Sequence, residues 1–302
     1  MKRNTLIRRF LQLIPTGLIL LAALAQAPAA AQQRLPAWQV VHAQRPGQLL
    51  LLGSIHLLRE SDYPLPSVVD DVYAQADNVV FEIDLDDIDP AQIQTQFMGA
   101  AMLAKGTSLS DVLEPQLYSR VAEEAQALGI DLQLFSRFEP WFVATMLMSI
   151  GLGRQGYEPR FGIEQYLLAK AKLDGKDVLG VEALETQVAV FDLLSETDQA
   201  SFLEQTLAEL QRDDAAMQEL VAAWRSGELD QLQDDLLEDF AQFPGLYQRL
   251  VVDRNEAWIR VLDELSSREE VSAVVVGALH LVGEDSLIEL LRERGYTVSE
   301  LR

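Results

Sequence analysis

The hydrophobic pattern of the chain contains two short apolar runs that repeat one arrangement. Residues 49–58 read LLLLGSIHLL, and residues 273–282 read AVVVGALHLV. In each run, apolar residues precede a glycine, two spacers and a histidine, His56 or His280. Continuous apolar runs of this kind predict strands that are buried on both faces of a sheet. Because open α/β sheets place their sites beyond the carboxyl ends of the strands, the repeat predicts one site shared by the two histidines.

The rest of the pattern alternates between further strands and helices. No Pro-, Ser- or Gly-rich linker divides the chain, so one domain is expected from residue 32 to residue 302, with a helical subdomain at about 90–173. The predicted class is α/β. The further strands are predicted at 38–43, 78–83, 177–182 and 296–299, and the helices at 67–76, 90–104, 115–128, 140–152, 162–173, 196–225, 228–240, 252–265 and 285–293.

Residues 1–31 predict a secretory signal peptide. Basic residues precede an apolar run, and an alanine-rich stretch follows with small residues where signal peptidase requires them. Cleavage is expected after Ala31, which would place the mature protein in the periplasm or outside the cell without a membrane anchor. An uncleaved anchor is the alternative, although the apolar run is shorter than the ~20 residues of a span.

Composition narrows the classes of partner and chemistry. Without the basic leader, 20 Lys and Arg face 47 Asp and Glu, a net charge of −27. This charge argues against nucleic acid and anionic lipid as partners. The chain has no cysteine, which excludes disulfides, thiolate nucleophiles, cysteine-ligated metals and a lipoprotein anchor.

Charged residues lie within or next to several of the predicted elements. Glu82 interrupts the apolar run NVVFEI, and a buried carboxylate requires a partner because an unpaired ion there is costly. A structural ion pair or a ligand would satisfy it. Glu182 ends another predicted strand, and Arg254 is the natural counter-charge, with a surface position as the alternative. Glu164 and Arg160 flank a helix start, where Glu164 would also favour the helix dipole.

Four strand ends therefore present His56, Glu82, Glu182 and His280. Imidazoles and carboxylates without a thiolate suit a divalent metal such as Mn, Co, Fe or Zn, which would activate water in a hydrolase. In the alternative without metal, a histidine oriented by Glu82 acts as the base and Arg254 or Arg160 stabilises the oxyanion. No G-x-S-x-G motif is present for serine-triad chemistry. The third histidine, His42, is interpreted as a partly buried strand residue.

The short motifs that contain these residues run in order along nearly the whole mature chain, and through them the chain resembles the TraB/PrgY/GumN family, in its secreted GumN-like branch. At Asp253 the family usually has Glu. The motifs are GSIH at 53–56, FEID at 81–84, GIE at 162–164, GVE at 180–182 with Gln187, DRN at 253–255, and GALH at 277–280 with Gly283.

The resemblance implies a mixed sheet flanked by helices, with His56, Glu82 and His280 as the centre. The family is similar to the Tiki proteins, metalloproteases that use Mn or Co, and more distantly to erythromycin esterases and haem-binding ChaN proteins. PrgY-type relatives limit peptide pheromone signalling, by cleavage or by capture. The leading hypothesis is a metal-dependent peptide hydrolase, with His56 and His280 as metal ligands and Glu82 as a further ligand or the general base. The alternatives are a non-enzymatic protein that captures a peptide, another small molecule, a metal or haem, and a scaffold with structural histidines.

Overall fold

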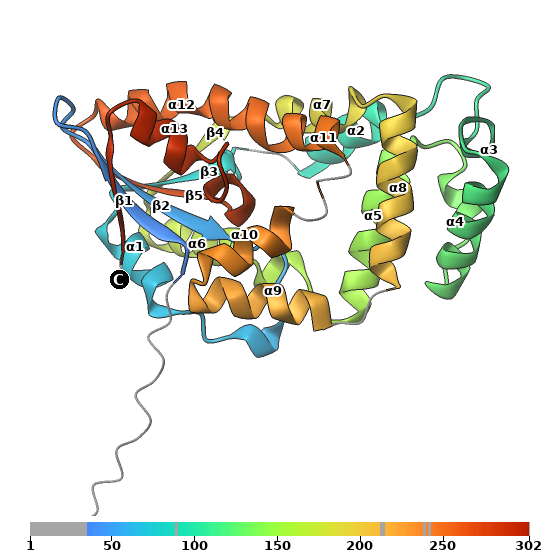
Figure 1. Ribbon diagram of the computed structural model, residues 1–302, viewed down its shortest axis with the longest axis horizontal. Helices are drawn as coiled ribbons and strands as arrows, with labels where there is room; N and C mark the ends of the chain where they lie inside the picture. Colours follow the sequence, from blue (N-terminus) through green and yellow to red (C-terminus); the bar gives the residue numbers. More distant parts are fainter. Residues whose placement is uncertain (1–34, 88–89, 212–214, 238–239, 241–242, 302) are drawn as a thin grey trace, which may run out of the picture. The chain divides into compact units, whose positions relative to one another are not determined.

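The computed structural model describes residues 35–87, 90–211, 215–237, 240 and 243–301 (Figure 1). The predicted signal peptide, residues 1–31, lies outside these ranges. Within them, no helix has both the length and the apolar composition that crossing a membrane requires.

In this part of the chain, six strands form one mixed sheet in the spatial order β4-β3-β5-β2-β1-β6. Neighbours among β4, β3, β5 and β2 are parallel, whereas β1 pairs antiparallel with both β2 and β6. The predicted mixed α/β fold is therefore confirmed. The strands span Ala37–Val41 (β1), Gln48–Ser54 (β2), Asn78–Ile83 (β3), Asp177–Glu182 (β4), Val271–Gly277 (β5) and Thr297–Glu300 (β6).

The two repeated apolar runs are neighbours at the centre of the sheet. Every residue of β2 and β5 after the first is buried. The two strands pair in parallel, with Ser54 opposite Gly277. Their carboxyl ends therefore reach the same edge of the sheet, and both histidines follow at that edge.

Alternate residues of β2 face two different layers of helices. Leu50 and Leu52 pack with α1, α6 and α9, while Leu49 and Leu51 pack with α12 and α13. Figure 1 shows these two groups of helices on opposite sides of the strands. Cover on both faces explains why the central strands are apolar throughout. These helices span Ser67–Gln75 (α1), Ile163–Asp174 (α6), Ala215–Ser226 (α9), Asp253–Ser266 (α12) and Leu287–Glu293 (α13).

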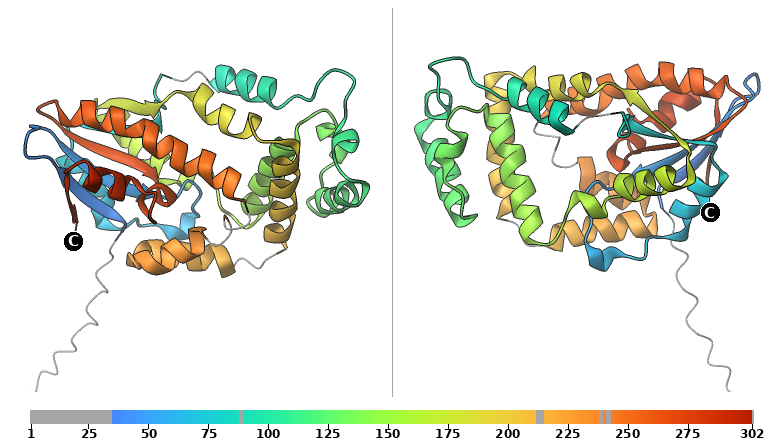
Figure 2. Two further views of the ribbon diagram at one scale, coloured as in Figure 1. Left: turned by 45° about the horizontal axis from the view of Figure 1, so that its top comes forward. Right: turned by 180° about the vertical axis from the view of Figure 1, so that it is seen from behind.

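A third cluster of buried side chains is built from helices. Figure 2 shows the ribbon of the chain in two further views. Trp141 stacks on Phe191 with 5.4 Å between ring centroids, and Leu203 and Leu207 extend the cluster. Helix α6 packs against the sheet instead, although it falls within the predicted helical subdomain of residues 90–173. The helices that contribute to this third cluster span Pro90–Ala100 (α2), Leu109–Val112 (α3), Pro115–Ala127 (α4), Pro140–Arg154 (α5), Leu184–Asp192 (α7) and Glu196–Leu210 (α8).

The acidic region predicted as one helix over 196–225 forms two helices, α8 and α9. Helix α8 packs on α5, whereas α9 packs on the sheet layer, and one continuous helix would not reach both. Downstream lie α10, α11 and the π-helix η5, which leads directly into α12. These three elements span Leu229–Leu237 (α10), Pro244–Tyr247 (α11) and Gln248–Val252 (η5).

Candidate functional site

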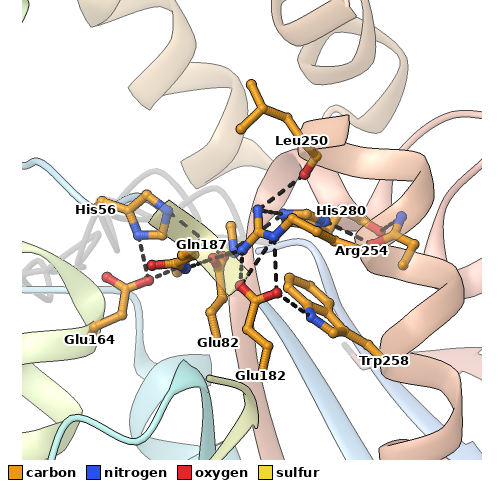
Figure 3. A network of polar contacts seen from close by, with 12 residues as sticks. His56, Glu82, Glu164, Glu182, Gln187, Leu250, Arg254, Trp258 and His280 are labelled. Atoms are coloured by element: carbon orange, nitrogen blue, oxygen red, sulfur yellow. Dashed lines mark hydrogen bonds and ion pairs between the residues drawn. The ribbon is translucent and has the colours of Figure 1, made fainter. Parts of the chain in front are cut away.

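The parallel strand ends bring the residues expected from the sequence to one place (Figure 3). Glu82 lies near the end of β3 and Glu182 ends β4, while His56 follows β2. His280 follows β5 in a short 3₁₀ helix, Ala278–Leu281 (η6). Because these four strands run in one direction, their carboxyl ends share an edge. Arg254 reaches this edge from the first turn of α12.

Arg254 links two of the carboxylates in a buried ion pair. Its Nη2 atom lies 2.6 Å from Glu82 Oε2 and 2.6 Å from Glu182 Oε1, and its Nε atom also donates to Glu182. Its Nη1 atom donates to the carbonyl oxygen of Leu250 and to His280 Nε2. These contacts engage all the N–H groups of the guanidinium. Arg254 therefore anchors the cluster, and no N–H remains for the oxyanion role considered from the sequence.

His280 is buried and bonded at both ring nitrogens. Its Nε2 atom accepts from Arg254 at 3.1 Å, and because a guanidinium can only donate, the ring proton must lie on Nδ1. Nδ1 then donates to Asn255 Oδ1 at 2.7 Å. Burial, followed by the charge of Arg254, lowers the pKa of His280 to about 3. This histidine is therefore neutral near pH 7.

His56 has the opposite environment. Its side chain is 59% exposed, and its Nδ1 atom lies 2.8 Å from Oε1 of the mostly buried Glu164. Ser54 Oγ donates to the same carboxylate oxygen. The negative charge of Glu164 raises the pKa of His56 to about 9 against the opposing effect of desolvation. His56 is therefore a positively charged imidazolium at neutral pH, unless a bound cation replaces one of its two ring protons.

Glu82 lies between the two histidines. Its Oε1 atom is 3.8 Å from His56 Nε2 and 3.9 Å from His280 Nε2, and it accepts the backbone N–H of Gly277 at 2.9 Å. Its Oε2 atom accepts from Gln187 and Arg254. Burial opposes ionisation, but the imidazoles, Arg254 and the Gly277 N–H outweigh it and lower the pKa of Glu82 to about 2.

Gly277 leaves the space that this arrangement needs. A Cβ atom at this position would lie 3.2 Å from His56 Nε2 and 3.3 Å from Glu82 Oε1. A side chain there would intrude between the imidazole and the carboxylate. The glycine of the second repeated motif is therefore explained by the site as well as by the strand.

The cluster carries more negative than positive charge. Glu82, Glu164 and Glu182 face one guanidinium, so the formal charge is −2 when both imidazoles are neutral. All three carboxylates are mostly buried, and uncompensated buried charge is costly. The cluster therefore favours an additional cation, and the proton on His56 supplies part of that charge.

The donor atoms suit a divalent ion in kind, but they are not already assembled around one. Two imidazole nitrogens and a carboxylate oxygen are common ligands of Mn, Fe, Co and Zn. In the described ranges, no group of three or more His, Cys, Asp or Glu side chains is arranged around a common metal position. At this cluster, Arg254 occupies the lone pair of His280 Nε2 that an ion would use.

Two cavities meet at the cluster, and His56 and Glu82 line both of them. One, of about 270 Å³, is lined by Glu164, Gln165 and Gln187 together with apolar residues of β3 and of the segment after it. The other, of about 310 Å³, lies under α9, α10 and η5 and is mainly apolar. A ligand in either cavity would therefore lie beside His56 and Glu82.

Two residues that the sequence analysis considered, Arg160 and His42, lie away from the cluster. Arg160 is 68% exposed, pairs with Glu158 at 2.7 Å and lies over the ring of Phe161, so the structure does not bring it to the cluster. A helix start indicates a position along the chain but not the direction of a long side chain. His42 lies beside Tyr296, with 4.9 Å between ring centroids.

Two residues that hold the cluster in place were not predicted from the sequence as site residues. Trp258 lies one helical turn after Arg254, donates its indole N–H to Glu182 and packs against the ring of His280 at a tilt of 42°. Asn255 fixes His280 Nδ1. The only signal for them was the motif at residues 253–255 and the helical spacing of four between Arg254 and Trp258.

Fold and cluster together define an α/β protein with a polar site at the carboxyl ends of its parallel strands. The chain belongs to the TraB/PrgY/gumN family, whose model matches residues 36–300. It is 29% identical over 257 residues to the uncharacterized protein YbaP of Escherichia coli (strain K12), with 84% of this chain and 92% of YbaP covered. An uncharacterized protein of Treponema pallidum (strain Nichols) is 24% identical over 275 residues, with 85% of this chain and 80% of the relative covered. No solved structure matches significantly.

Proposed function

We propose that the protein is a hydrolase that cleaves amide bonds of peptides in the periplasm or outside the cell, with His56, Glu82 and His280 at its centre. The observation that carries the proposal is the placement of His56. Its exposed ring is held at Nδ1 by a mostly buried carboxylate, and its Nε2 atom faces Glu82 beside two cavities. His280 differs from it, because both of its ring nitrogens are buried and bonded.

The residues around the two histidines have distinct roles in this proposal. Glu164 accepts the Nδ1 proton of His56, which directs Nε2 towards the substrate, as carboxylates do behind metal-bound histidines. Arg254 neutralises Glu82 and Glu182 and fixes their positions. It is a positioning residue. Gln187 and the Gly277 N–H hold the Glu82 carboxylate in one orientation.

The proposal includes a divalent ion, with His56 Nε2, Glu82 Oε1 and His280 Nε2 as the atoms that would hold it. The negative charge of the cluster favours a cation, and the donor atoms are of the right kind. When bound, such an ion would polarise the amide carbonyl and lower the pKa of a water molecule. The chain must release His280 Nε2 from Arg254 and remove the proton from His56 Nε2 to accept it, since ligands bind in their unprotonated form.

The second candidate function is capture of a peptide, a metal or haem without cleavage. One observation favours it: Arg254 saturates His280 and leaves His56 as the accessible imidazole of the cluster. A protein that only binds its ligand would not need a second free base.

Elemental analysis is the first experiment. Protein purified from the periplasm without chelators or an affinity tag should contain near-stoichiometric Mn, Fe, Co or Zn. The His56→Ala, His280→Ala double variant should lose that metal. The control is His42→Ala, which removes the histidine beside Tyr296 and should keep the metal. Equal metal content in the wild type and the double variant would refute the metal assignment.

Peptide turnover separates the two functions. The metal-loaded wild type is incubated with a peptide library, and mass spectrometry records both new fragments and retained peptides. New fragments that require His56 and His280 support the hydrolase. Retention of intact peptides without fragments would overturn it and favour capture.

A further inference from the structure

The apolar cavity beside the cluster has a consistent construction. Its wall on the helical side consists of aliphatic and thioether side chains from three elements: Met217 and Leu220 of α9, Leu232 and Leu236 of α10, and Leu250 of η5. On the other side it reaches His56, Glu82, His280 and Arg254, whose N–H groups are already engaged within the cluster. The wall residues are uncharged, so a charged group placed among them would lose its hydration without gaining a partner.

The helices that form this wall are attached to the sheet at the site. Trp224 of α9 donates its indole N–H to the carbonyl oxygen of Gly53, at 2.7 Å, within the first glycine–histidine motif. Arg225 donates to the carbonyl oxygens of Asp62 and Pro64, in the segment that follows His56. The cavity is thus part of the folded structure next to the imidazole, which favours a preformed pocket.

The other cavity adds amide and carboxylate groups. Glu164, Gln165 and Gln187 line it together with apolar residues of β3, and it shares His56 and Glu82 with the first cavity. A ligand that lies across both cavities would place a polar chain on this side and an apolar group under α9 and α10. A peptide with a large apolar side chain beside its reactive amide has this combination of groups.

We propose that the α9–α10 cavity is a specificity pocket for a large aliphatic or thioether side chain, such as Leu or Met, of the residue that flanks the cleaved amide. This inference rests on the proposed function and names the substrate class. At about 310 Å³, the cavity lies at the small end of the range for ligand pockets and accommodates one such side chain. Acidic and basic side chains at this position are excluded by desolvation.

The test uses capped peptides that differ at one residue, with Leu, Met, Ala, Asp or Lys at that position, and the metal-loaded full-length protein. The wild type should cleave the Leu and Met peptides about 10-fold or more faster than the Ala peptide, measured as kcat/KM. It should leave the Asp and Lys peptides uncut.

Met217→Trp tests the pocket itself by filling it from a partly buried wall position. This variant should lose most of the Leu preference, so that the Leu-to-Ala ratio of kcat/KM falls towards 1. The matched control is Leu173→Trp, which introduces the same side chain at a position on α6 that is 86% exposed and should keep the wild-type preference. An unchanged Leu-to-Ala ratio in Met217→Trp, or a wild-type preference for Asp or Lys, would overturn the pocket assignment.

Equilibrium binding of the same peptides separates failure of the pocket from failure of the hydrolase. If the wild type cleaves none of them but binds the Leu peptide, and Met217→Trp abolishes that binding, the pocket stands and the hydrolase falls. If the wild type neither binds nor cleaves the Leu and Met peptides, the pocket assignment is wrong.

Discussion

The two glycine–histidine motifs have nearly the same pattern, yet their histidines have opposite properties. His280 is buried, bonded at both nitrogens and has a pKa lowered to about 3, whereas His56 is exposed and has a pKa raised to about 9. The strands that precede them are parallel neighbours, so the difference does not come from the strands. It comes from the helices that cover each strand end: α12 supplies Arg254 and Asn255 to His280, and α6 supplies Glu164 to His56. One half of the site is a rigid anchor and the other is accessible to a ligand.

Removal of the anchor should have the largest effect. Arg254→Ala leaves Glu82 and Glu182 buried without their counter-charge, and loss of one partner from a buried pair costs about 3–5 kcal/mol. The free energy of unfolding from urea titrations measures this loss. Arg260→Ala is the control, because Arg260 is 77% exposed and its pair with Glu264 contributes about 0.5 kcal/mol or less. Equal losses in both variants would contradict the anchor role.

Replacement of the two histidines should have unequal effects on stability. His280→Ala leaves Asn255 Oδ1 and an Arg254 N–H without a partner, so we expect a loss of about 2–3 kcal/mol. His56→Ala removes a ring that is mostly exposed together with the counter-charge of Glu164, and because solvent screens this pair the loss should be smaller, about 1 kcal/mol. Urea unfolding of both variants beside wild type gives the comparison. A larger loss for His56→Ala would reverse the assignment of anchor and accessible half.

The pH dependence of stability should show both histidines with opposite sign. The folded pKa of His280, about 3, lies below the ordinary 6.5, so the unfolded chain binds a proton that the folded chain refuses, and stability falls as the pH decreases from about 6.5 to about 3. For His56, with a folded pKa of about 9, the stabilising contribution is complete below about pH 6.5 and is lost as the pH rises through 9.

Urea titrations of metal-free protein across the pH range measure both limbs. His280→Ala should flatten the acid limb and His56→Ala the alkaline limb. His42→Ala should keep the shape of the wild-type profile. Retention of both limbs in the two site variants would show that other groups cause them.

The smallest expected effect is a shift in the pKa of His56. Glu164→Gln removes the main cause of the raised pKa of His56, so that pKa should fall from about 9 towards 6.5 in metal-free protein. NMR titration of the imidazole signals is practical because the chain has three histidines. Glu264→Gln, at an exposed pair on α12, is the control and should leave the His56 titration in place. An unchanged pKa in Glu164→Gln would show that Glu164 does not control His56.

The sequence predicts the strands well, because burial on both faces leaves a direct signal. The bounds of β3 and β4 agree with the runs at 78–83 and 177–182, and the repeated motif locates the edge where the strand ends meet. An acidic residue within an apolar run, as at Glu82, indicates that a partner exists. The parallel sheet then explains why residues far apart in the chain meet.

The environments of these residues are not visible in the sequence. His56 and His280 have almost the same neighbours in the chain, and the helices that make them different are more than 100 residues away from His56 and about 25 residues before His280. Helices α9 and α10 are a second example. Their apolar faces are visible in the pattern, but the pattern does not say that these faces border the site.

The Glu82 carboxylate, which binds Gly277 and faces both imidazoles, also makes the site sensitive to strand register. Val79 lies opposite Ala273 and Val80 opposite Val274, and each step along a strand is about 3.3 Å. Insertion of a single residue into β5 would shift Gly277 and His280 past Glu82 by that step, or turn the strand over. Pairing errors during folding would thus abolish the site even though every side chain remained, and insertion scanning along β5 with the pKa of His56 as the readout would reveal it. Alignment of the two strands is therefore as much a requirement of the chemistry as the identity of the residues.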